Sequence, residues 1–86
     1  MTTPMATIVN SPHVLGRAVR DARRTLKLSQ TELGLRVGLT QVTVSRIERG
    51  AGRATLDTLL RVLAALGLEL ALQHRPVQDP PFPWES

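Results

Sequence analysis

The stretch SQTELGLRVGLTQVTVSRIERG, residues 29–50, predicts two short helices joined by a tight turn. Ser29 and Glu32 have the S-x-x-E spacing of a capping box, in which the serine oxygen accepts an amide proton and the glutamate reaches back. Gly38 supplies the left-handed conformation with which helices commonly end. Thr40 is placed to cap a second helix, which runs to the glycine that closes the stretch. Because helices this short are unstable alone in water, the rest of the chain must pack them.

The residues before this stretch predict a longer amphipathic helix. Ser11-Pro12 is a start signal, with a serine at the N-cap and a proline at the first helical position. Apolar side chains then recur at three- and four-residue spacing: Leu15, Ala18, Val19, Ala22 and Leu26. The opposite face is mostly basic: Arg17, Arg20, Asp21, Arg24 and Lys27. We expect the basic face to be exposed.

The residues after the stretch predict a final helix and a strand. Thr55 caps a helix over residues 56–66, which is apolar nearly all round and therefore needs cover on two sides. Residues 68–73 then alternate leucine with other side chains, which is strand periodicity. Pairing with the same strand of a second copy would make a two-fold dimer, and pairing with residues 5–9 is the alternative. The expected dimer interface is Leu63, Leu66, Leu68, Leu70 and Leu72.

Together these elements predict an all-α fold class. We expect a compact helix-turn-helix domain of four to five helices, with a short C-terminal β-strand that pairs across a homodimer. Residues 1–10 form an N-terminal arm, residues 11–74 the DNA-binding and dimerisation domain, and residues 75–86 a proline-rich tail. The tail holds the only aromatic residues of the chain, Phe82 and Trp84.

Composition argues against several functions. The chain has no cysteine, no apolar run long enough for a membrane span, and no signal peptide at its start. We therefore expect a cytoplasmic protein that does not associate with a membrane. His13 and His74 have no carboxylate cluster or second histidine near them in sequence. Neither metal-ligand spacing nor a nucleophile with a base is present. We therefore expect no enzyme, no metal site and no cofactor.

The charge of the chain favours a polyanionic partner. The net charge is +4, and ten of the eleven cations are arginine. Two of the seven acids lie in the tail, so residues 1–75 hold eleven cations against five acids, a net charge of +6. An arginine-rich body suits nucleic acid, although a merely soluble basic surface is the simpler alternative.

The second helix of the stretch carries side chains suited to DNA. Gln41 can form paired hydrogen bonds with adenine, and Val42 can meet a thymine methyl group. The residues expected at base edges are Thr40, Gln41, Val42, Ser45 and Arg46. Those expected at phosphates are Ser29, Gln30, Thr43, Arg49 and Arg53. For Arg17, Arg20 and Arg24, phosphate contact and simple solubility remain equal alternatives.

The pieces L-S-Q-T-E-L-G and V-G-L-T-Q-V-T-V-S-R-I-E-R-G resemble the helix-turn-helix of the phage-repressor, XRE-type family over roughly residues 15–66. In that family an arginine of the first helix pairs with the glutamate before the final glycine. By register these are Arg23 and Glu48, which the resemblance marks as a structural ion pair. Gly34 stands where the family usually has alanine, and we expect it to loosen its helix by up to about 1 kcal/mol.

The flanks are similar to HipB-like antitoxins, through the Ser11-Pro12 start, the L-E-L-A-L-Q strand and a tail with a tryptophan. The resemblance implies a homodimer that binds a palindromic operator in double-stranded DNA and holds a HipA-like kinase toxin, with Phe82 and Trp84 docking on the toxin. Function is therefore expected to be that of an antitoxin and transcriptional autorepressor. Two alternatives stay open: a stand-alone XRE-type repressor without a toxin, and a protein-interaction module that has lost DNA binding.

Overall fold

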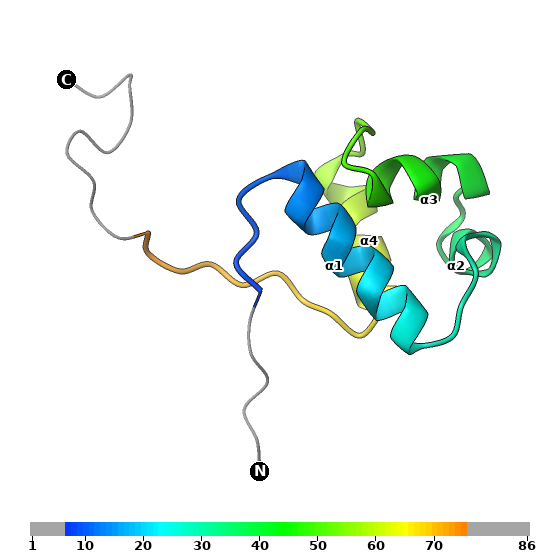
Figure 1. Ribbon diagram of the computed structural model, residues 1–86, viewed down its shortest axis with the longest axis horizontal. Helices are drawn as coiled ribbons and strands as arrows, with labels where there is room; N and C mark the ends of the chain where they lie inside the picture. Colours follow the sequence, from blue (N-terminus) through cyan, green and yellow to red (C-terminus); the bar gives the residue numbers. More distant parts are fainter. Residues whose placement is uncertain (1–6, 76–86) are drawn as a thin grey trace, which may run out of the picture.

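The computed structural model describes residues 7–75, which contain four α-helices (Figure 1). They are α1 (Pro12–Thr25), α2 (Gln30–Val37), α3 (Gln41–Glu48) and α4 (Leu56–Ala65). The predicted all-α helix-turn-helix fold is confirmed. Helix α3 lies between α1 and α2 in the packing, since it contacts both, while α4 covers the far side of the group (Figure 1). None of these four helices is long and apolar enough to cross a membrane.

Each helix begins at its predicted cap. The four N-cap side chains each accept a hydrogen bond from the backbone N–H three residues further on, at 2.9–3.2 Å, and these caps are Ser11, Ser29, Thr40 and Thr55. After α2, Gly38 has a φ of 74° and donates its N–H to the Gly34 carbonyl. This is the left-handed helix end that the sequence predicts. Lys27 also has a positive φ, 58°, in the turn after α1, and no signal in the sequence indicated it.

The core takes one fully buried side chain from each helix. These are Val19 of α1, Leu33 of α2, Val44 of α3 and Val62 of α4. Leu63 and Leu66 join the same cluster and are only 6% and 5% exposed. Both were expected at the dimer interface, but the core of the single chain already covers them. They have almost no surface left to offer a partner.

Two glycines permit close backbone approaches. A Cβ atom on Gly16 would lie 2.4 Å from the Glu48 carbonyl oxygen, so α1 crosses the end of α3 nearly backbone to backbone. A Cβ on Gly34 would lie 2.5 Å from the Leu39 carbonyl oxygen, and the Leu39 N–H donates to the Gly34 carbonyl at 2.8 Å. Gly34 therefore closes the turn after α2. That Gly34 also lowers the stability of α2, through its low helix propensity, stays a prediction.

The predicted C-terminal strand is not formed in the single chain. Residues 7–75 contain no β-strand, and residues 7–9 form no ladder with the segment after α4. The segment leaves α4 as an extended chain, with Leu70 51% and Leu72 94% exposed (Figure 1). A strand needs a neighbour to satisfy its N–H and C=O groups, and the described residues offer none. Phe82 and Trp84 lie outside the described residues.

Candidate nucleic-acid interface

Helix α3 presents two rows of side chains to solvent. Gln41, Ser45 and Arg49 recur every four residues, which places them above one another on one side of the helix axis. Val42 and Arg46 form the neighbouring row and are exposed. The opposite side of α3 is held in the core by Val44, Ile47 and Glu48, all buried. Four of the five residues predicted at base edges therefore lie on the solvent side, and the fifth, Thr40, is the exposed N-cap before α3.

Beneath this face, Arg23 of α1 and Glu48 of α3 form a buried ion pair. Arg23 Nε donates to Glu48 Oε2 at 2.6 Å, and a terminal guanidinium nitrogen of Arg23 donates to Glu48 Oε1 at 3.0 Å. A further nitrogen of Arg23 donates to the Leu28 carbonyl at 2.8 Å. The hydrogen bonds to Glu48 raise the pKa of Arg23, although burial opposes them, so the guanidinium stays charged. The pair ties α1 to the end of α3.

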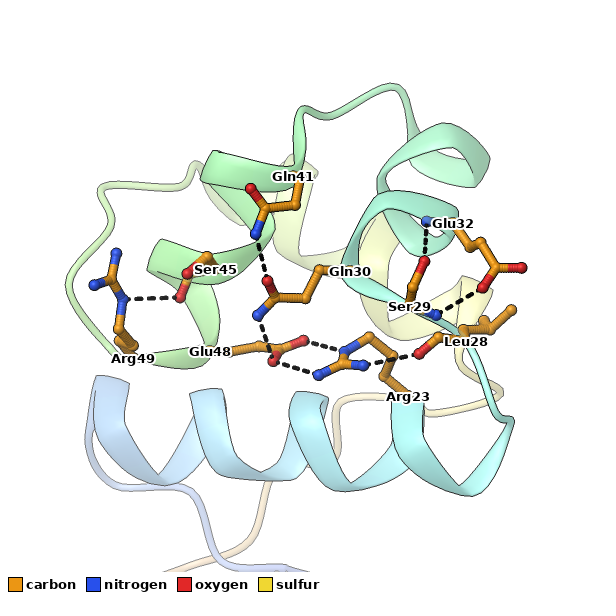
Figure 2. Close-up of polar contacts among 9 residues, drawn as sticks. All are labelled: Arg23, Leu28, Ser29, Gln30, Glu32, Gln41, Ser45, Glu48 and Arg49. Atoms are coloured by element: carbon orange, nitrogen blue, oxygen red, sulfur yellow. Dashed lines mark hydrogen bonds and ion pairs between the residues drawn. The ribbon is translucent and has the colours of Figure 1, made fainter.

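A chain of hydrogen bonds leads from this pair to the exposed face (Figure 2). Gln30 Nε2 donates to Glu48 Oε1 at 3.1 Å, and Gln41 Nε2 donates to Gln30 Oε1 at 2.6 Å. The direction of every amide follows from Glu48, because a carboxylate can only accept. Gln30 must turn its NH₂ group toward Glu48, which leaves its oxygen for the NH₂ group of Gln41.

This order leaves the amide oxygen and one N–H of Gln41 available for hydrogen bonds with a ligand outside the protein. Adenine presents an N–H donor at N6 and an acceptor at N7 in the major groove, and these match the two free groups of Gln41. Gln41 therefore faces solvent with an amide already oriented for adenine. Sequence spacing predicted Gln41 and Gln30 as separate contacts and did not show that one orients the other.

The residues expected at phosphates differ in their exposure and in which hydrogen-bonding groups remain available. The Ser29 hydroxyl and N–H are both engaged in the capping box, with Glu32 N and Glu32 Oε1 each at 2.9 Å. The hydrogen bond that the Ser29 N–H donates to the Glu32 carboxylate is the largest cause that lowers the pKa of Glu32. Only the hydroxyl proton of Ser29 remains to be donated. Thr43 is half-buried, with its hydroxyl 3.0 Å from that of Thr40, whereas Arg49 and Arg53 are exposed.

The structure also places near α3 two arginines whose role, phosphate contact or solubility, the sequence left undecided. Arg20 and Arg24 of α1 line an open cleft together with Arg49, the C-cap residue of α3. Arg17, which shares the basic side of α1, does not line it. The i, i+4 spacing of Arg20 and Arg24 was a signal that they share one side of α1. Their position beside α3 depends on the crossing of the two helices. Among residues 7–75, no three histidine, aspartate or glutamate side chains gather as a metal site requires.

The profile of the helix-turn-helix family HTH_3 matches residues 19–73, more than half of the chain. The chain belongs to the XRE-type helix-turn-helix family. It is accordingly a DNA-binding regulator, and it shares this architecture with proteins of several functions.

Among its XRE-type relatives are an antitoxin and several uncharacterised regulators. The antitoxin HipB of Escherichia coli K12 is 31% identical over 74% of this chain and 73% of its own length. A regulator of Sinorhizobium fredii, y4dL, is 48% identical over 63% of this chain, which spans only 28% of that longer protein. The likeness to HipB extends to structures of a HipB–O4 20mer complex and of a HipA–HipB–O2–O3 complex. Each has 29% identity and a TM-score of 0.71 over 80% of this chain and 97% of the other.

Proposed function

We propose that this protein is a sequence-specific DNA-binding antitoxin that represses its own toxin–antitoxin operon. The observation that carries the DNA-binding half is the amide of Gln41, exposed on α3 and oriented through Gln30 by the buried ion pair. The toxin half is supported by the likeness to HipB, which was solved with HipA. The partner is then a HipA-like kinase toxin.

Binding follows from the two kinds of side chain on the interface. Gln41 forms paired hydrogen bonds with an adenine in the major groove, and Thr40, Val42, Ser45 and Arg46 meet the neighbouring base edges. Ser29, Gln30, Thr43, Arg49 and Arg53 hold phosphates, so affinity falls steeply with salt. A homodimer joined through residues 68–72 places two copies of α3 about 34–36 Å apart, one turn of DNA, which suits a palindromic operator.

A stand-alone XRE-type repressor is the second candidate. The relative with 48% identity, y4dL, is an HTH-type transcriptional regulator. The two candidates share the DNA interface and differ only in whether a kinase binds the protein.

The DNA half is tested with Gln41→Ala. We expect the wild type to prefer a duplex from upstream of its own reading frame over a scrambled duplex. The variant should lose about 1–3 kcal/mol of that preference, because one paired contact is gone. Gln73→Ala is the matched control, since Gln73 is exposed and lies outside α3. A Gln41→Ala variant that keeps the full preference would remove Gln41 from the base-reading role.

The toxin half is tested by expressing the protein with the product of the neighbouring reading frame. We expect a kinase-like protein to co-purify with the full chain and to be released when residues 76–86, which include Phe82 and Trp84, are deleted. Co-purification that survives the deletion would move the docking site elsewhere. A neighbour that is no kinase and does not co-purify would leave the stand-alone repressor as the function.

A further inference from the structure

The cleft between α1 and α3 is lined almost wholly by charged and amide side chains. Its lining residues are Arg20, Arg23, Arg24, Gln30, Ser45, Glu48 and Arg49. Two of them, Arg23 and Glu48, form the buried ion pair at its floor and neutralise one another. Glu48 is the single carboxylate of this lining, and it already accepts from Arg23 and Gln30. No other carboxylate in the lining balances the remaining cations.

Those cations are the exposed Arg20, Arg24 and Arg49. Arg20 and Arg24 lie one helical turn apart on α1 and line one side of the cleft. Arg49 forms the other wall at the end of α3. Its Nε donates to the Ser45 carbonyl at 3.4 Å, which folds the side chain back along α3 and leaves both terminal nitrogens free (Figure 2). Three guanidinium groups thus border one hollow.

The cleft continues the base-reading row of α3. Ser45 and Arg49 line the cleft, whereas Gln41 does not. Figure 2 shows Gln41 above Gln30, which does line the cleft. Gln30 lines the cleft as well and holds Gln41. The sugar–phosphate backbones of DNA border the major groove, so a duplex whose bases met Gln41 would place phosphates near this side of α3.

We infer that this cleft binds a backbone phosphate of DNA through Arg20, Arg24 and Arg49, which makes α1 a part of the DNA interface. This inference rests on the proposed DNA binding and adds a second element to it. Guanidinium groups suit the ligand because their planar N–H donors match phosphate oxygens in pairs. The contact carries no base information, so it fixes the position of α3 on the duplex and adds affinity on any sequence.

The test compares two double variants that lose the same charge. R20Q/R24Q removes one wall of the cleft, whereas R17Q/R61Q removes two exposed arginines that do not line it. Fluorescence anisotropy measures binding to a random-sequence duplex and to the duplex upstream of the reading frame, each over a series of KCl concentrations. Circular dichroism checks that both variants melt as the wild type does.

We expect R20Q/R24Q to weaken binding about tenfold on both duplexes, which corresponds to the loss of charge-assisted hydrogen bonds. The slope of log affinity against log salt should fall by about 0.9 for each protomer. R17Q/R61Q should stay within about twofold of the wild type, since distant exposed charges are screened.

Equal losses in the two double variants would overturn the inference in favour of diffuse charge. A loss confined to one duplex would show base contact, and an unchanged R20Q/R24Q would exclude the cleft. Inorganic phosphate exchanged for chloride at equal ionic strength should weaken DNA binding by the wild type more than by R20Q/R24Q, because it competes for the cleft; equal weakening of the two would contradict the inference. A wild type that binds neither duplex would overturn the proposed function itself, and the inference with it.

Discussion

Glu48 has two roles, which a single variant and a double variant together distinguish. Its carboxylate neutralises the buried Arg23, and it sets the direction of the Gln30 and Gln41 amides. Glu48→Gln leaves Arg23 as a buried charge without a counter-charge, so we expect the free energy of unfolding to fall by about 3–5 kcal/mol. Urea denaturation measures this loss.

The second role of Glu48, which is to orient the Gln30 and Gln41 amides, is tested in a variant that regains stability. Replacing both partners, as R23M/E48L, removes the buried charge, so we expect it to recover most of the lost stability. It should not recover the preference for the upstream duplex over the scrambled one, because nothing then fixes the Gln30 amide. A double variant with wild-type preference would show that Gln41 orients itself.

The crossing of α1 over α3 depends on the absence of a side chain at Gly16. Gly16→Ala gains up to about 1 kcal/mol of helix propensity. It also places a Cβ within 2.8 Å of three backbone atoms of Ile47 and Glu48, none of which can rotate away. We expect a net loss of about 1–3 kcal/mol in unfolding free energy. Gly52→Ala is the control, since its Cβ would meet nothing closer than 3.4 Å; equal effects of the two variants would contradict this account.

The capping box of α2 predicts a dependence of stability on pH. Hydrogen bonds from Ser29 hold the pKa of Glu32 below its ordinary value of 4.5. The folded state therefore binds that proton less readily than the unfolded state. The contribution of Glu32 is present above pH 4.5 and is lost as the pH falls through its lowered pKa. Thermal melts should show Glu32→Gln less stable than the wild type at pH 7, with the gap closing toward pH 3. A gap that stays constant would show that the glutamate charge plays no part.

Within residues 7–75, apolar side chains are exposed on α4 and in the segment that follows it. Leu56 and Leu60 of α4 are exposed, as are Leu70 and Leu72 in the segment that follows. A second copy is the occupant we propose, since strand pairing would also satisfy the backbone of that segment. We expect the wild type to sediment as a dimer and L70E/L72E as a monomer with weakened operator binding. Leu35→Glu, on α2 and 79% exposed, is the control that should remain dimeric; a monomeric wild type would contradict the proposal.

The sequence by itself determined the features that depend on residues within about one helical turn of each other. The four caps join residues three apart, so Ser11, Ser29, Thr40 and Thr55 could be read directly, and the outer row of α3 followed from helical spacing. Arg23 and Glu48 were paired through the resemblance to a family, not from spacing.

Only the tertiary structure decided how distant residues meet. It joined Gln41 to Gln30 and Gln30 to Glu48, set Arg20 and Arg24 beside Arg49, and buried Leu63 and Leu66 in the core of one chain. The physical reason is the angle and depth at which the helices cross. A helical pattern shows which side of a helix is apolar, but the side chains that complete a contact come from another helix.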